Sequence, residues 1–146
     1  MEGLVFKLTP DGNGKVTESI VHDFGSGGCC TDGVHPFNGL TIDAAGNLYG
    51  AVQGGGGTTT VCTGGDVDTG CGIVYKLTPN ASKTAWEETI LYAFFGESDG
   101  ATPLDDHVAV DDKGNVFGSA AEGGDFNAGC PGNQPGGCGV VFEVKP

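Results

Sequence analysis

The sequence predicts an all-β protein made of repeated units of four short antiparallel strands, arranged like the blades of a propeller. One strand-like segment occurs three times, at positions 3–10, 72–79 and 139–146, so it recurs about every 70 residues. Other segments recur between these copies in the same order. The apolar runs are short and lie between Gly, Pro, Asn and Asp, as in strands joined by turns. No apolar pattern with helical spacing extends over about ten residues, so no significant helix is expected.

Two units and one extra strand account for the chain. The first strand of a unit is expected at about 40–43 and 107–111, the second at 47–52 and 115–120, the third at 3–9, 72–78 and 139–145, and the fourth at 16–24 and 87–95. We therefore expect a single repeat domain, 1–146, with two strands at 3–24, a repeat unit at 36–95 and a partial unit at 103–146.

The expected turns also repeat. Segment 9–14 combines Pro, Asp, Gly and Asn, which favour a turn because Pro fixes φ and Gly and Asn accept positive φ. Segments 43–47 and 111–115 are hairpin loops of one kind, with Gly at the left-handed position. At the end of the fourth strands, 20–25 aligns with 91–96 through a shared Phe-Gly pair.

The strand count favours assembly. A unit of four strands cannot bury both faces alone, and propellers close with about four to eight blades. Three explanations are open: a piece of a longer propeller, a ring of several copies, or a head-to-tail assembly in which a neighbour's strands fill the incomplete unit. A sandwich of two sheets is the alternative fold.

The composition excludes several classes of protein. Among 146 residues, 29 are Gly, and six Lys and Arg against 19 Asp and Glu give a net charge of −13. The chain lacks the cationic surface that nucleic acids and anionic membranes require. No apolar run reaches the about 18 residues of a membrane-spanning helix. Eight Phe, three Tyr and one Trp supply material for a core, so disorder is not expected.

The repeated motifs resemble those of a known family. The third strand reads Gly-x-Val-[Phe/Tyr]-[Lys/Glu]-[Leu/Val]-x-Pro, a Phe-Gly pair follows the next strand, and the hairpin reads Asp-x-x-Gly-Asn-[Leu/Val]-[Tyr/Phe]-Gly. Across essentially the whole chain, this pattern resembles the tandem GloVer repeats of large, exported or surface-anchored bacterial proteins. The resemblance implies a propeller-like fold outside the cytoplasm and no catalytic residues. The hairpin motif alone is also similar to NHL-type propeller repeats.

Four of the six cysteines follow the repeat. Cys62 and Cys71 bracket a Gly-rich loop between the second and third strands of one unit, and Cys130 and Cys138 bracket the same loop in the next. This placement predicts disulfides 62–71 and 130–138, each contributing about 2–3 kcal/mol, and hence an oxidising compartment. Zinc ligation is the alternative, although the spacings lack the short C-x₂₋₄-C form.

Cys29 and Cys30 are adjacent in an insertion, 25–32, that the second unit lacks. They form either a vicinal disulfide, which we favour, or a bridge to another chain. A vicinal ring would staple the insertion, or it would serve as a ligand platform or a redox site.

The histidines provide candidate chemistry. His35 and His107 precede or open the first strands, the innermost strands of a blade, so with Asp105 and Asp32 they could converge near a central channel. Histidine and carboxylate together bind a divalent metal or act as an acid–base pair. His22 lies late in a fourth strand. Surface histidines beside acidic turns are the alternative reading.

Loop carboxylates and aromatic residues are further candidates for binding sites. Asp66 and Asp68 would add oxygens to a calcium site, and calcium is the cofactor that we consider. Exposed aromatic side chains, with Tyr49, Trp86 and Phe126 as candidates, would form a platform for a glycan or a small ligand.

Three functions are therefore open. The repeat and the absence of catalytic motifs favour a non-enzymatic, extracellular bacterial module that self-assembles into a ring or filament, or that belongs to a larger surface propeller. Its partner would be another copy or the remaining repeats of a longer chain. The alternatives are a glycan or small-ligand binding module, and a metal-dependent propeller lyase or hydrolase using His35, Asp105 and His107.

Overall fold

The computed structural model describes residues 3–26, 31–57, 62, 70–104, 107–125, 130 and 137–146. This part of the chain is all-β, as predicted, and contains no α-helix. Its strands are β1 (Leu4–Pro10), β2 (Val16–Asp23), β3 (Thr41–Ile42), β4 (Leu48–Val52), β5 (Ile73–Pro79), β6 (Trp86–Ala93), β7 (Ala109–Val110), β8 (Val116–Ala120) and β9 (Val140–Val144). A short 3-10 turn, η1, spans Glu97–Asp99. Every strand lies where the sequence predicts one, although β3 and β7 are shorter than expected.

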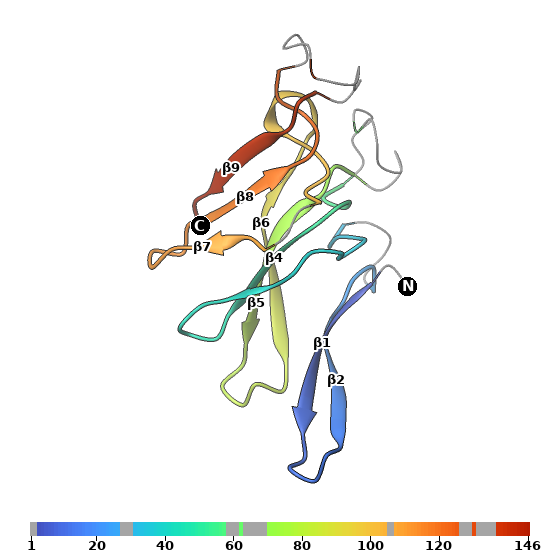
Figure 1. Ribbon diagram of the computed structural model, residues 1–146, viewed down its shortest axis with the longest axis vertical. Helices are drawn as coiled ribbons and strands as arrows, with labels where there is room; N and C mark the ends of the chain where they lie inside the picture. The colour runs from blue at the N-terminus through green and yellow to red at the C-terminus, as the bar shows by residue number, and fades with distance from the viewer. Residues whose placement is uncertain are drawn as a thin grey trace.

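The strands form three antiparallel sheets, of two, four and three strands. The orders are β1-β2, β3-β4-β5-β6 and β7-β8-β9, so each strand pairs with its neighbour in the sequence. Figure 1 shows the sheets following one another in chain order, with the first and third at opposite ends. The sheets fall within the predicted segments 3–24, 36–95 and 103–146, and we call them the first, second and third units.

The second unit contains all four strands of the repeat. By the repeated motifs, β1 and β2 correspond to β5 and β6, whereas β7, β8 and β9 correspond to β3, β4 and β5. The same strand of the repeat therefore lies inside the second sheet as β5, but at the edge of the other two sheets as β1 and β9.

The pairing register corrects one detail of the expected alignment. The amide of Phe24 donates a hydrogen bond to the carbonyl of Gly3 at 3.0 Å, and the amide of Phe94 donates to Gly72 at 2.9 Å. Phe24 is therefore equivalent to Phe94, and not to Phe95 as the shared Phe-Gly pair implies. Both pairs of strands also carry an irregularity at the same place in the register.

The predicted hairpin loops at 43–47 and 111–115 are present and alike. Oδ1 of Asp43 accepts a hydrogen bond from the amide of Asn47 at 2.9 Å, and Oδ2 accepts one from its side-chain nitrogen at 2.7 Å. Asp111 and Asn115 make the same two bonds, at 2.8 and 2.7 Å. The glycine of each loop has φ of 89° or 84°, in the region that favours glycine.

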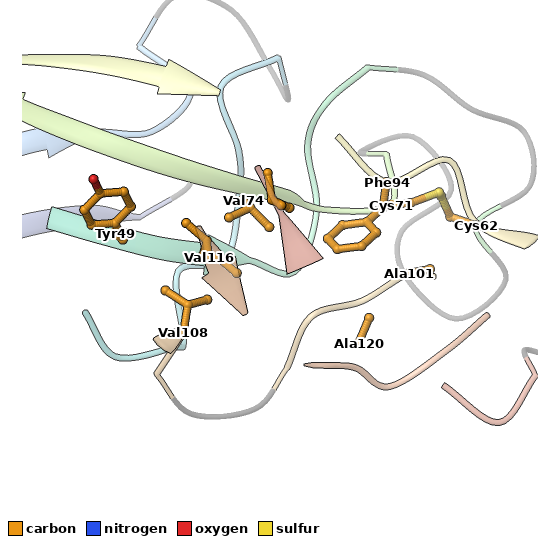
Figure 2. Close-up of a cluster of buried hydrophobic side chains, with 11 residues drawn as sticks. Tyr49, Cys62, Cys71, Val74, Phe94, Ala101, Val108, Val116 and Ala120 are labelled. Atoms are coloured by element: carbon orange, nitrogen blue, oxygen red, sulfur yellow. A yellow bond between two sulfur atoms is a disulfide. The ribbon is translucent and has the colours of Figure 1, made fainter. Parts of the chain in front are cut away.

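Two apolar clusters join the units. Val5 of the first unit lies in one cluster with Tyr75 of the second unit. Val74 and Phe94 of the second unit lie in the other cluster with Val116 of the third, as Figure 2 shows. Because side chains alternate along a strand, β5 presents one face to each neighbouring unit.

Candidate functional site

The two junctions between units are built in the same way. After β2, Val34 pairs with Gly54 through amide–carbonyl bonds of 3.1 and 3.3 Å. After β6, Ala101 pairs with Glu122 through bonds of 3.0 and 3.1 Å. In both cases the segment that links two units is hydrogen-bonded to the residues that follow the second strand of the next unit. The chain thus repeats its junctions as well as its sheets.

Each junction includes two glycines whose backbones touch. A Cβ atom on Gly55 would collide with Cα of Gly33, and one on Gly123 would collide with Cα of Gly100. Gly55 and Gly123 also have φ of 105° and 87°. Part of the high glycine content therefore serves the contacts between units rather than the turns.

His35 has a defined place in the first junction. Its φ is 57°, and Thr102 has φ of 56° at the equivalent place in the second junction. The carbonyl of His35 accepts a hydrogen bond from the amide of Gln53 at 3.4 Å, as the carbonyl of Thr102 does from Ala121 at 3.1 Å. His35 and Thr102 thus hold equivalent positions in the two junctions and share a left-handed backbone conformation.

The first unit exposes apolar side chains at positions that the second unit buries. Phe6 and Leu8 of β1 are 50% and 54% exposed. The equivalent residues of β5 are Tyr75 and Leu77, which are 2% and 0% exposed. Tyr75 and Leu77 are covered because their face packs against the first unit. Phe6 and Leu8 lie on the equivalent face of the first unit, where about half of each side chain remains exposed.

The third unit shows the same contrast on its opposite face. Val141 of β9 is 87% exposed, whereas the equivalent residues Val74 and Val5 are 0% and 6% exposed. Val5 and Val74 are each covered by the following unit. The first and third units therefore expose opposite faces of the repeat, each of which is buried in the second unit.

A groove lies beside β9 at the second junction and is lined in part by Tyr92, Asp99 and Phe142. Oδ2 of Asp99 accepts hydrogen bonds from the hydroxyl of Tyr92 at 2.8 Å and from the amide of Phe95 at 3.1 Å. Oδ1 of Asp99 is buried and has no hydrogen-bond partner among the described residues. β9 is the edge strand of the third sheet, and Phe142, Glu143 and Val144 of this strand line the groove.

A cluster of three polar side chains closes the first junction. His22 comes from β2, Asp32 from the segment that follows it, and Glu88 from β6 of the second unit. Nε2 of His22 lies 3.9 Å from Oδ2 of Asp32 and 3.7 Å from Oε1 of Glu88. The three side chains are 16%, 19% and 13% exposed. Within the part of the chain that the structure describes, no other group of His, Cys, Asp and Glu is close enough to share a metal ion.

The surroundings of this cluster shift the pKa values of His22 and Glu88. The ring of His22 packs edge-on against Phe24, with centroids 4.5 Å apart. Burial lowers the pKa of His22 although Asp32 and Asp23 oppose the change. Burial, with a smaller contribution from Asp32, raises the pKa of Glu88 to about 7. The lowered pKa of His22 favours the uncharged imidazole, and the raised pKa of Glu88 favours its protonated carboxyl group.

The second junction has a different pair at the equivalent place. Tyr92 corresponds to His22 in the strand register. Asp99 corresponds to Asp32, because each carboxylate accepts the amide that follows the equivalent Phe. Tyr92 bonds directly to Asp99, whereas His22 does not reach Asp32. Sequence reasoning missed the cluster of three, because Glu88 joins it only when two units stack.

The predicted histidine site remains a prediction. The ring of His107 lies against Gly39, and His35 lies in the first junction. Asp105 lies outside the described residues. The same is true of Asp66 and Asp68 of the predicted calcium site, of Phe126, and of Cys29 and Cys30.

One of the predicted ligand-binding aromatics is not at the surface. Tyr49 is 3% exposed, which corrects the expectation of an exposed platform at this residue. Its hydroxyl donates to Oδ2 of Asp43 at 3.1 Å, and Nζ of Lys76 lies 5.5 Å from its ring centroid. Trp86 begins β6, as expected, and is partly buried against the cluster at the first junction.

The structure joins Cys62 to Cys71 and Cys130 to Cys138, with Cα atoms 5.3 Å apart in both pairs. These are the two pairings that the sequence predicts. Cys62 and Cys71 are buried beside Phe94, as Figure 2 shows. Disulfides persist in oxidising compartments, so the two bonds indicate a protein that is not cytoplasmic.

Comparison of the chain with protein-family models, with curated proteins and with solved structures finds no match. Among the described residues, no helix is both long and apolar enough to cross a membrane.

Proposed function

We propose that the chain is a non-enzymatic β-repeat module that joins head to tail with further copies of itself. The first unit of one copy stacks on the third unit of the next, as the second unit stacks on the first within the chain. Such a contact uses two different faces, so it either closes into a ring or continues as a filament.

The uneven burial of two repeat positions carries this proposal. Leu77 is fully buried inside the molecule, whereas Leu8 at the equivalent place is 54% exposed, and Val74 and Val141 differ still more. Exposed apolar side chains are common on protein surfaces. Leu8 and Val141 differ from such residues because each has a buried equivalent, Leu77 or Val74. The two also lie on opposite faces of the repeat. A copy stacked at each end would bury Leu8 and Val141 as Leu77 and Val74 are buried now.

The groove beside β9 offers a neighbouring copy a second contact, separate from the stacked faces. A free strand edge presents unpaired amides and carbonyls that pair readily with another strand. Next to this edge, Oδ1 of Asp99 is buried without a hydrogen-bond partner among the described residues. A neighbouring strand paired to β9 would cover the groove and bring donors close to Asp99.

The energetics predict a reversible association. Full burial of a Leu, Val or Phe side chain contributes about 1.5–3 kcal/mol, and Phe6 and Leu8 are already half-buried. Association costs about 4–15 kcal/mol in lost freedom, so these side chains alone offset only part of the cost. Strand pairing at the edges must supply the rest, and the assembled fraction should rise with concentration.

We also propose the finer identity that the motifs imply. The repeated third strand and the Asp-x-x-Gly-Asn hairpin support units of the GloVer type, forming a propeller-like assembly at a bacterial surface. The four-stranded second unit has the strand order of a propeller blade. The two disulfides are compatible with this location.

Sedimentation velocity over a wide range of concentrations tests the proposal. We expect the wild-type mass to rise above the 14.6 kDa of one chain, and L8E and V141E each to lower association because a buried carboxylate is costly. I42E is the matched control, since Ile42 is an exposed strand residue of the second unit, 66% exposed, away from both end faces. A wild-type protein that stays monomeric at every concentration would contradict the proposal.

A further inference from the structure

We propose that His22, Asp32 and Glu88 form a Zn²⁺ site that fastens the first unit to the second. The three residues come from β2, from the segment after it and from β6, so an ion held by all three would link two sheets. This proposal is independent of assembly between copies, because every ligand belongs to one chain.

The geometry suits a small cation. The ligand atoms of the three side chains all lie within 4.8 Å of one another. In a tetrahedral zinc site, with bonds of about 2.0–2.1 Å, neighbouring ligand atoms lie about 3.3 Å apart. The distances of 3.7 and 3.9 Å from Nε2 of His22 are slightly longer than this. Small side-chain movements would therefore complete the site.

Two polar atoms of the cluster lack hydrogen-bond partners, whereas Oδ1 of Asp32 accepts a bond from the amide of Gly25 at 2.9 Å. Nε2 of His22 and Oε1 of Glu88 are buried and make no hydrogen bond within the described structure. At 3.7 Å they are also too far apart to bond directly. Burying polar groups without partners is costly, so a bound ion between them would remove a penalty that the fold otherwise carries.

The donor set favours zinc over calcium or magnesium. Calcium takes six to eight oxygen ligands and magnesium an octahedron of oxygens, with no place for imidazole. Imidazole and carboxylate are common zinc ligands, and three protein ligands leave a fourth position for water.

The second junction provides an internal comparison. There Tyr92 occupies the place of His22 and donates directly to Asp99 at 2.8 Å. A tyrosine–aspartate bond therefore closes this junction without any ion. H22Y should reproduce that arrangement at the first junction with Asp32, which makes it a folded variant that lacks the metal ligand.

The test is a Zn²⁺ titration by calorimetry on the oxidised chain, prepared without a histidine tag, with proton NMR of the histidine rings. The chain has three histidines, so the signal of His22 can be identified by its loss in H22Y. We expect one ion per chain, a shift of the His22 signal, and binding at least about tenfold weaker in H22Y and in E88Q. Calcium should not compete.

E18Q is the matched control for E88Q. Glu18 holds the equivalent position in β2 and is exposed, so its loss removes the same charge without touching the cluster. E18Q should bind Zn²⁺ as the wild type does. Zinc binding that is unchanged in H22Y and E88Q, or equally weakened in E18Q, would overturn the proposal. Absence of zinc binding to the wild type would overturn it as well and would leave water as the occupant of the cluster.

Discussion

Gly55 shows how single residues determine the stacking of units. Its Cα–H face lies directly on the backbone of Gly33, and its φ of 105° is one that side chains rarely adopt. Gly123 and Gly100 repeat the arrangement at the second junction. Gly55 is therefore needed for two separate reasons: there is no space for a side chain, and the backbone conformation is one that side chains rarely adopt. The sequence shows the glycine runs, but it does not distinguish a turn glycine from a contact glycine.

Replacement of Gly55 separates these two requirements. We expect G55A to lower the free energy of unfolding by at least about 3 kcal/mol, because the new Cβ collides with backbone and the left-handed φ is strained. G12A is the control, since Gly12 has a similar φ of 80° but open space around its Cβ position. It should cost only about 1 kcal/mol. Urea unfolding measures both, and equal losses would contradict the proposed contact.

The candidate site illustrates what sequence patterns leave out at this scale. His22 and Asp32 are ten positions apart in the printed chain, and Glu88 lies far beyond them. Nothing in their spacing indicates a shared site, because the contact depends on how β6 packs over β2. In contrast, the 62–71 and 130–138 disulfides were predictable, since both pairs bracket the same loop of the repeat.

At the scale of elements, the hairpin loops explain why the strands could be located from sequence. Asp43 and Asp111 each bind the backbone of the residues that follow, and these bonds fix the turn wherever the motif occurs. The strand register was harder to predict. Phe94 and Phe95 are adjacent and equally apolar, so only the backbone pairing shows that Phe94 is the equivalent of Phe24.

The Asp43 loop gives a prediction with a defined pH dependence. Burial acts to raise the pKa of Asp43, but hydrogen bonds from Asn47, Tyr49 and Ala45 outweigh it and the pKa is lowered. A carboxyl group with a lowered folded pKa stabilises the protein above its unfolded pKa of about 3.9, and this stabilisation is lost as the pH falls through the folded pKa. D43A should therefore destabilise the protein by about 1 kcal/mol at neutral pH, and by less in acid.

Thermal unfolding of D43A and wild type between about pH 7 and about pH 2 checks this expectation. D112A serves as the control, because Asp112 lies in the equivalent loop of the third unit and its side chain makes no hydrogen bond with any described residue. A difference between D43A and wild type that stays constant down to the lowest pH would contradict the assigned role of the carboxylate.

At the scale of the whole molecule, the three sheets make one kind of stacking contact twice, once at each junction. We propose that the two ends make a third contact of this kind between copies. Phe6 and Leu8 lie at one end and Val141 at the other, each exposed where its equivalent in the second unit is buried. The sequence indicated an incomplete number of strands, but the exposed faces became visible only in the packed structure. We therefore propose a head-to-tail contact between two different faces.

Mixing two variants tests this central claim most directly. L8E keeps an intact Val141 face, and V141E keeps an intact Leu8 face, so each alone should sediment as a monomer. A head-to-tail contact predicts that an equimolar mixture forms a one-to-one dimer and grows no further, because each dimer has one blocked face at either end. A mixture in which both proteins remain monomeric, or in which one variant alone still forms long assemblies, would contradict the account.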